Sequence, residues 1–178
     1  MALLQHTNTQ NGSAKLRSVR RLAFLSVCLL LAACNSDEGS KPASGPDPLV
    51  DGGRPAFEAF VSKQRGKPVV VNKWASWCGP CRAEFPYFQH QARTRKDVVF
   101  VGVNSNDNDG DARDFLDENP VPYKSFRDPK LEVAAAFNGV QAFPTTAFYD
   151  SKGKLVYTHP GGYQSEDDLA EDIDRYAR

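Results

Sequence analysis

Apolar and polar residues follow two different spacings along residues 55–178 of this chain. Residues 123–128 predict a short strand or an extended segment. Four other segments are short, apolar and rich in β-branched or aromatic residues, as strands are: residues 69–75, 97–104, 145–150 and 154–159. The first two are apolar almost throughout, which is typical of strands buried on both faces. The last two flank a Ser-Lys-Gly turn, so they predict an antiparallel hairpin.

Between these runs, apolar residues recur three or four positions apart, which is the spacing of one helix face. The segments concerned are residues 55–65, about 80–95, 112–119, 131–138 and 166–178. Helices and strands therefore alternate until the closing hairpin. This order predicts an α/β fold in which helices cover both faces of a mixed central sheet.

The N-terminal region has a different character. Residues 15–34 place basic residues before an apolar run of about a dozen residues, the order of a secretory signal peptide, whereas a membrane-spanning helix needs about 20. The run ends in Leu-Ala-Ala-Cys, which resembles a lipobox and implies lipidation of Cys34. A plain signal peptide with an incidental cysteine, or an uncleaved anchor, remains open.

Residues 35–53 are rich in Gly, Pro, Ser and Asp and show no apolar periodicity, which predicts a flexible tether. We therefore divide the chain into a lipoprotein signal peptide (1–34), this tether, and a folded domain over residues 54–178. The domain is expected outside the cytoplasm, anchored to a membrane by lipid.

The number and distribution of charged residues argue against nucleic acid as a partner. The chain has 22 basic and 22 acidic residues, and the four basic residues before Cys34 leave 18 basic residues for the rest. No basic stripe with interleaved aromatic residues occurs, so we expect no nucleic-acid binding. A monomer is expected.

Of the four cysteines, Cys28 lies in the signal and Cys34 is the lipidation candidate, which leaves Cys78 and Cys81. Three residues apart at the start of a helix, they lie on one face and close enough for a disulfide. Helix N-terminal amides favour the Cys78 thiolate, so its pKa should fall below the free value of about 8.5. We expect Cys78 to attack substrate disulfides and the more buried Cys81 to resolve the mixed disulfide.

A structural disulfide and a zinc site are the two alternative roles for Cys78 and Cys81. A structural disulfide would close a very short loop and add little stability. A zinc site would need two further ligands, and the domain offers only His90 and His159, which are unpaired in sequence. We therefore predict a redox-active pair, with no metal site and no cofactor beyond the disulfide itself.

The sequence VVVNKWASWCGPC resembles the active-site strand and helix of thioredoxin-fold proteins. The following CRAEFP, the extra strand-helix segment at 98–122 and the FPTT at 143–146 resemble the TlpA/ResA/DsbE branch, whose members are extracytoplasmic, membrane-tethered thiol-disulfide oxidoreductases. The resemblance covers residues 55–178 and implies a thioredoxin-like fold.

The resemblance also implies roles for residues near the cysteines. Pro144 matches the family's cis-proline that faces the CxxC, and Phe143 and Thr145 beside it are expected to contact the substrate. Glu84 matches an acidic residue of this branch and would accept a proton from Cys81; the alternative is a solvated surface charge. Asn72 stands where cytoplasmic thioredoxins have a buried Asp.

Five further positions near the cysteines complete the sequence prediction. Trp77 is expected beside the CxxC at the surface, and Gly79 and Pro80 between the cysteines influence the redox potential. Pro86 matches the family's helix kink. Lys73 departs from the family, which usually has a large apolar residue there. Its ammonium was expected either to snorkel to the surface or to lie near the active-site carboxylate.

Two metal interpretations are less favoured. The NDNDGD segment at 106–111 suggests calcium, but placing Gly110 at position six of an EF-hand loop puts Ser105 and Leu116 at ligand positions, where neither fits. A loop and a helix cap are predicted instead. A copper chaperone of the Sco kind would have CxxxC rather than CxxC.

The direction of electron flow follows from the Gly-Pro pair, which is that of thioredoxin, with a reduction potential near −270 mV. The resemblance to the TlpA/ResA branch likewise implies a reductase of protein disulfides, such as those of apocytochrome c or copper-site cysteines, which would receive electrons from a membrane donor of the CcdA/DsbD kind. The alternatives are a disulfide-forming oxidase, a thiol peroxidase and a non-enzymatic metal-binding module.

Overall fold

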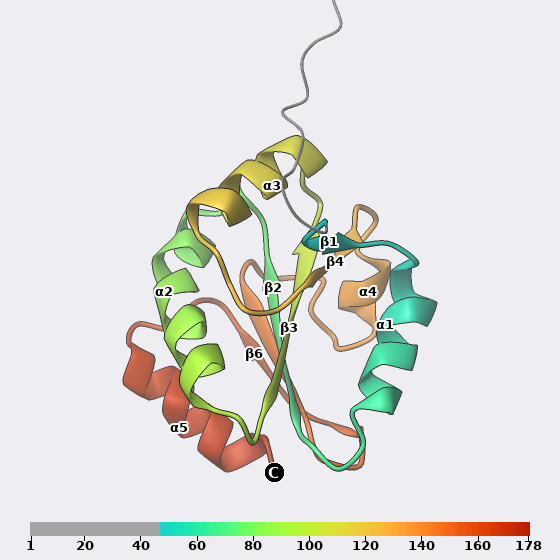
Figure 1. The fold of residues 1–178 in the computed structure, drawn as a ribbon, viewed down its shortest axis with the longest axis vertical. Helices are drawn as coiled ribbons and strands as arrows, with labels where there is room; N and C mark the ends of the chain where they lie inside the picture. Colours follow the sequence, from blue (N-terminus) through green and yellow to red (C-terminus); the bar gives the residue numbers. More distant parts are fainter. Residues whose placement is uncertain (1–46) are drawn as a thin grey trace, which may run out of the picture. The chain divides into compact units, whose positions relative to one another are not determined.

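The computed structural model describes residues 47–178 and contains one six-stranded sheet in the order β1-β4-β3-β2-β5-β6 (Figure 1). The strands are β1 (Leu49–Val50), β2 (Val69–Trp74), β3 (Val99–Ser105), β4 (Ser125–Asp128), β5 (Thr145–Tyr149) and β6 (Leu155–Pro160). The helices are α1 (Gly53–Lys63), α2 (Gly79–Thr94), α3 (Asp109–Glu118), α4 (Glu132–Ala135) and α5 (Glu166–Tyr176). The predicted signal peptide, Cys34 and most of the predicted tether lie outside the described residues.

The predicted fold class is confirmed. Strands β2, β3 and β4 run parallel, β5 pairs antiparallel with β2, and β5 and β6 form the C-terminal hairpin. Figure 1 shows α2 and α5 on one face of the sheet and α1 and α4 on the other. Between residues 47 and 178, no helix has both the length and the apolar character needed to cross a membrane.

Strand β2 is buried along its whole length because helices cover both faces of the sheet. Val69 and Val71 pack in a cluster with residues of α1 and α4, such as Phe57 and Val133. Val70 packs in a second cluster with Phe88 of α2 and with residues of α5. Alternate residues of β2 therefore point toward opposite helical layers, as the pleat of a strand requires.

Two elements differ from the sequence prediction. The segment predicted as a tether contains β1, which pairs parallel with β4 and buries Leu49, and α1 already begins at Gly53. Two strand residues are too few to show a periodicity. The helix predicted over 131–138 is shortened to α4, because Leu131 and Asn138 both adopt positive φ (61° and 59°).

Asp128, the last residue of β4, fixes the start of α4. Its carboxylate accepts hydrogen bonds from the amides of Val133 and Ala134, each at 2.9 Å, and from the hydroxyl of Ser105 at 2.8 Å. The carboxylate thus satisfies free amides at the helix N-terminus, where negative charge is also favoured. The connection from β4 to β5 therefore starts at a buried carboxylate that holds the first turn of α4 in place.

Trp74 at the end of β2 packs against Phe85 and Phe115, and its indole donates to the hydroxyl of Ser125 at 3.0 Å. Gly102 on β3 makes room for this contact. A Cβ at Gly102 would lie 2.0 Å from the Ser125 hydroxyl oxygen and 3.1 Å from the indole nitrogen. The active-site end of β2 therefore depends on a glycine in the neighbouring strand.

We expect Gly102→Ala to lower the free energy of unfolding by about 1–3 kcal/mol, because the added methyl group overfills a packed site. Urea denaturation measures the change. Gly79→Ala is the control: no atom lies within 4 Å of its Cβ position, so its effect should stay within about 0.5 kcal/mol. Equal stability of Gly102→Ala and the wild type would contradict this packing.

Candidate active site

Cys78 and Cys81 form a disulfide at the start of α2, with their Cα atoms 5.3 Å apart. Cys78 is the residue that caps the helix, and its sulfur accepts a hydrogen bond from the amide of Cys81 at 3.2 Å. Pro80 lies in the first turn, where a missing N–H is tolerated. The same amide can stabilise a Cys78 thiolate after reduction. Both side chains are buried in this oxidised form.

The predicted substrate loop lies beside the disulfide. The peptide bond between Phe143 and Pro144 is cis, as predicted. Phe143 packs against the cluster that contains both cysteines, and its ring centroid lies 4.9 Å from that of Trp77. Trp77 is 56% exposed and donates through its indole to the carbonyl of Asn106 at 2.9 Å. Together, Trp77 and Phe143 form an aromatic surface next to the sulfurs.

Thr145, which was also expected to contact the substrate, is buried at the start of β5. Its hydroxyl donates to the carbonyl of Ala142 at 2.8 Å. The side chain therefore supports the loop from inside the protein.

Glu84 is completely buried on α2 rather than solvated at the surface. One carboxyl oxygen accepts a hydrogen bond from the amide of Tyr163 at 2.9 Å, and the other has no partner within residues 47–178. Burial raises the pKa of Glu84 to about 8, and the Tyr163 hydrogen bond opposes this only in part. The carboxyl group can therefore exchange a proton near neutral pH.

The loop around Gly162, which the sequence analysis did not single out, lies next to Glu84 and two other predicted site residues. A Cβ at Gly162 would lie 3.5 Å from both the Glu84 carboxyl oxygen and the Pro144 ring, and 3.6 Å from Pro80. The turn around Gly162 thus packs against three predicted site residues at once.

Asn72 is buried on β2 and pairs in register with Thr146 of β5. Neither its amide atoms nor the hydroxyl of Thr146 has a hydrogen-bond partner within the described part of the chain. Burial raises the pKa of nearby Tyr123, and the charge of Glu84 adds to this increase. Asn72, Tyr123 and Glu84 therefore belong to one polar region behind the CxxC helix.

Asp107 supports the segment before Cys78, and the sequence analysis did not single it out. Its carboxylate accepts hydrogen bonds from the amide and hydroxyl of Ser76, at 2.6 and 2.7 Å, and from the Asn104 amide at 2.7 Å. The carboxylate fixes the segment that leads into Cys78. The predicted helix cap in the same loop is confirmed at Asn108, which accepts from the amides of Gly110 and Asp111.

Lys73 neither snorkels nor pairs with Glu84. Its side chain is fully buried and points to the opposite face of the sheet from Asn72. The ammonium donates to the carbonyls of Gly139 and Ala142 instead. Lys73 thus contacts the segment that leads into the predicted substrate loop.

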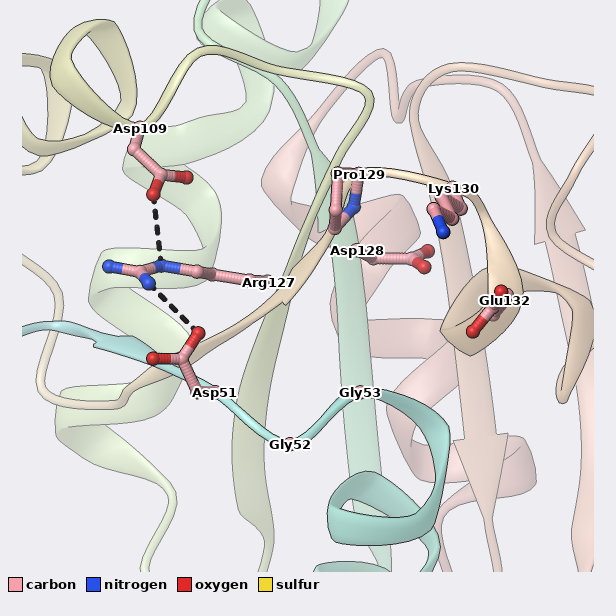
Figure 2. A pocket seen from close by; sticks show the side chains of 9 residues that line it. All are labelled: Asp51, Gly52, Gly53, Asp109, Arg127, Asp128, Pro129, Lys130 and Glu132. Carbon is pink, nitrogen blue, oxygen red and sulfur yellow. Dashed lines mark hydrogen bonds and ion pairs between the residues drawn. The ribbon is translucent and has the colours of Figure 1, made fainter. Parts of the chain in front are cut away.

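A separate pocket lies near the end of β4 and contains none of the predicted site residues (Figure 2). Arg127 extends between Asp51 and Asp109, at 2.8 and 3.3 Å. These ion pairs connect β4 with the segment before α1 and with α3. Within residues 47–178, no three His, Cys, Asp or Glu side chains gather in a way that could hold a metal ion.

The sequence model of the Redoxin family matches residues 56–173. The chain belongs to the Redoxin family. It is 39% identical over 99 residues to a thiol:disulfide interchange protein DsbE homolog of Paracoccus denitrificans, and 33% identical over 98 residues to the thiol-disulfide oxidoreductase ResA of Bacillus subtilis. These alignments cover 55% and 54% of the chain, and 53% and 54% of the two relatives, so the match spans about half the length of each.

Solved structures agree with this assignment. A thiol:disulfide interchange protein DsbE from Chlorobium tepidum has 34% identity and a TM-score of 0.57, and the match covers 65% of this chain and 83% of that one. The exposed lipoprotein thioredoxin Etrx1 from Streptococcus pneumoniae has 28% identity and a TM-score of 0.54, with coverage of 65% and 89%. This Redoxin-family protein is therefore similar to proteins described as DsbE and ResA thiol-disulfide oxidoreductases.

The buried Glu84 makes the stability of the oxidised protein depend on pH. Its folded-state pKa of about 8 lies above the usual 4.5, so between these values the folded state holds a proton that the unfolded chain has lost. The stabilisation is complete below the unfolded pKa and is lost as pH rises through the folded pKa. We expect a loss of roughly 3–4 kcal/mol between pH 5 and pH 8.

Urea denaturation at the two pH values measures this loss. Glu84→Gln should abolish most of it, because the amide does not titrate. Glu118→Gln, at the exposed end of α3, is the control and should keep the wild-type dependence. The same pH dependence in Glu84→Gln and the wild type would contradict the assignment.

Proposed function

We propose that the protein is a lipid-anchored, extracytoplasmic reductase of protein disulfides. The observation that carries this proposal is the Cys78–Cys81 pair at a helix N-terminus, bordered by the exposed Trp77 and by Phe143. An aromatic surface beside a reactive sulfur suits an extended polypeptide. The backbone of such a polypeptide would lie along the loop before Pro144.

In the proposed reaction the reduced protein begins with a Cys78 thiolate. This thiolate attacks one sulfur of a substrate disulfide, so that a mixed disulfide forms and the other substrate sulfur leaves as a thiolate. Cys81 then loses its proton and attacks the Cys78 sulfur. The Cys78–Cys81 disulfide forms, the second substrate thiolate leaves, and two electrons have passed to the substrate.

Glu84 suits the second step because it lies one turn after Cys81 on α2. With a pKa near 8, its ionised form is basic enough to accept a proton from a thiol and is present in a useful fraction at neutral pH. An exposed glutamate would be a much weaker base. A membrane dithiol donor of the CcdA/DsbD kind would then return the protein to its reduced form.

Three features support the direction, location and substrate. Gly79 and Pro80 form the dipeptide that accompanies a low reduction potential in thioredoxin. The Leu-Ala-Ala-Cys34 sequence supports lipid anchoring, and the similar pneumococcal protein is described as a lipoprotein. The resemblance to the TlpA/ResA/DsbE branch favours apocytochrome c or copper-site cysteines as substrates.

Cysteine variants test the exchange reaction. We expect the soluble protein from residue 47 onward to catalyse insulin reduction by dithiothreitol, and Cys78→Ser to lower the rate to background, because Cys78 supplies the nucleophile. Cys81→Ser should accumulate a mixed disulfide with the substrate, visible by non-reducing electrophoresis. Retained activity in Cys78→Ser would exclude this mechanism.

A companion assay tests the direction. The oxidised protein is mixed with reduced, unfolded ribonuclease, and recovery of ribonuclease activity is followed. A reductase should give little recovery. Recovery faster than insulin reduction would identify an oxidase, and tight stoichiometric metal binding without either activity would identify a binding module.

Lipid anchoring is tested separately in a bacterial host that processes lipoproteins. The full chain should incorporate labelled palmitate and sediment with membranes, because Cys34 would carry the lipid. Cys34→Ser should lose the label, whereas Cys28→Ser should keep it. Palmitate incorporation into Cys34→Ser would contradict the proposed anchor.

A further inference from the structure

We propose that Lys73 is a positioning residue for protein substrates: its buried ammonium holds the turn before Phe143, and the Phe143 ring itself, in place beside the disulfide. This inference rests on the proposed function and deepens it, because it names a residue that prepares the polypeptide-binding surface. Lys73 is not proposed to touch the substrate or the reacting sulfurs.

The ammonium group of Lys73 has three close partners. It donates to the carbonyl of Gly139 at 2.6 Å and to that of Ala142 at 2.7 Å. It also lies 3.4 Å from the centroid of the Phe143 ring, a cation–π geometry that gains strength in a water-free site. The two carbonyls fix the ends of the turn, and the aromatic contact fixes the ring that follows it.

The Phe143 ring is therefore held by contacts from two side chains. The Lys73 ammonium contacts its face, and the Trp77 ring packs against it. Trp77 is in turn tied to the loop after β3 through Asn106. A shift of Phe143 would therefore change the aromatic surface beside Cys78.

An opposite charge at the end of β4 favours the charged form of Lys73. Asp128 is also buried, and its negative charge favours the charged lysine, although burial still lowers the pKa of Lys73 to about 8. Figure 2 shows Asp128 pointing away from Arg127, toward the helix that carries Glu132. The carboxylate binds amides at the start of the β4–β5 connection, and the ammonium binds carbonyls near its end.

A simpler explanation is that the Lys73 side chain only fills space in the core. An apolar side chain would fill the same volume without the cost of burying a charge. It would also leave the carbonyl of Gly139 without its side-chain donor, while Ala142 would keep only the hydroxyl of Thr145. The specific effect of the lysine is thus on the geometry of the turn and of Phe143.

The effect should fall on substrate binding rather than on sulfur chemistry. Lys73 points toward the α1 and α4 layer, whereas Cys81 and Glu84 belong to α2, on the other face of the sheet. A small disulfide reaches the Cys78 sulfur without needing an extended surface. A protein disulfide needs the aromatic surface and the loop as well.

The experiment compares Lys73→Met with the wild type on two substrates. For insulin, KM should rise roughly tenfold with little change in kcat, because the lost contacts amount to about one factor of ten in affinity. For glutathione disulfide, the second-order rate constant should remain within about twofold of the wild type. Lys67→Met is the matched control: Lys67 also donates to a backbone carbonyl, that of Lys96, but at an exposed position away from the disulfide.

A double-mutant cycle separates positioning from a general effect on folding. Phe143→Leu removes the ring while leaving the core lysine in place, and it should raise the insulin KM by a similar factor. If Lys73 acts through Phe143, the double variant should raise KM no further than the larger single effect. Additive effects on KM would overturn the inference.

Other outcomes of these assays also test the positioning role of Lys73. An unchanged insulin KM in Lys73→Met, or an equal loss of activity on both substrates, would overturn the positioning role while leaving the proposed function intact. A wild-type protein that reduced neither substrate would contradict the proposed function itself. The selective rise in KM for the protein substrate, absent in Lys67→Met, is the result that supports the inference.

Discussion

The burial of β2 on both faces is the constraint on which the rest of the active site depends. Every residue from Val69 to Trp74 is buried, so each side chain must be accommodated by a helical layer. The strand ends directly before the segment that leads to Cys78. Its position in the sheet therefore sets where the disulfide lies relative to the loop after β3 and the loop before β5.

The layers packed on β2 bury two ionisable side chains on opposite sides of the sheet, Lys73 on the strand itself and Glu84 on α2. Burial favours the neutral form of each, so the pKa of Glu84 rises and that of Lys73 falls, both to about 8. The consequences differ because the partners differ. Within residues 47–178 one oxygen of Glu84 has no hydrogen-bond partner, which suits the residue to proton transfer. Lys73 is held by two carbonyls and a ring, which suits it to fixing geometry.

Much of the fold followed from local patterns. The continuous apolar runs predicted β2 and β3, and the turn between two apolar segments predicted the hairpin. The CxxC sequence and the family resemblance led to the disulfide and to the cis bond before Pro144. These features were accessible because their determinants lie within short stretches of the chain.

The remaining features depend on contacts between distant segments. Strand β1 forms because Leu49 and Val50 pair with β4. Two residues are too few for the sequence to predict this pairing. Asp107 binds Ser76, which lies 31 positions earlier, and Lys73 binds the carbonyl of Gly139, which lies 66 positions later. Residue types alone could suggest that Lys73 was unusual, but only the packed fold shows which groups surround it.

The central claim is that this arrangement makes Cys78 and Cys81 a reducing pair. The most direct measurement is the equilibrium reduction potential of their disulfide, obtained by titrating the soluble protein against glutathione and dithiothreitol. We expect a value near or below about −250 mV, in the range of thioredoxin. A value near −120 mV, that of the strong oxidant DsbA, would contradict the reductase role and assign the site to disulfide formation.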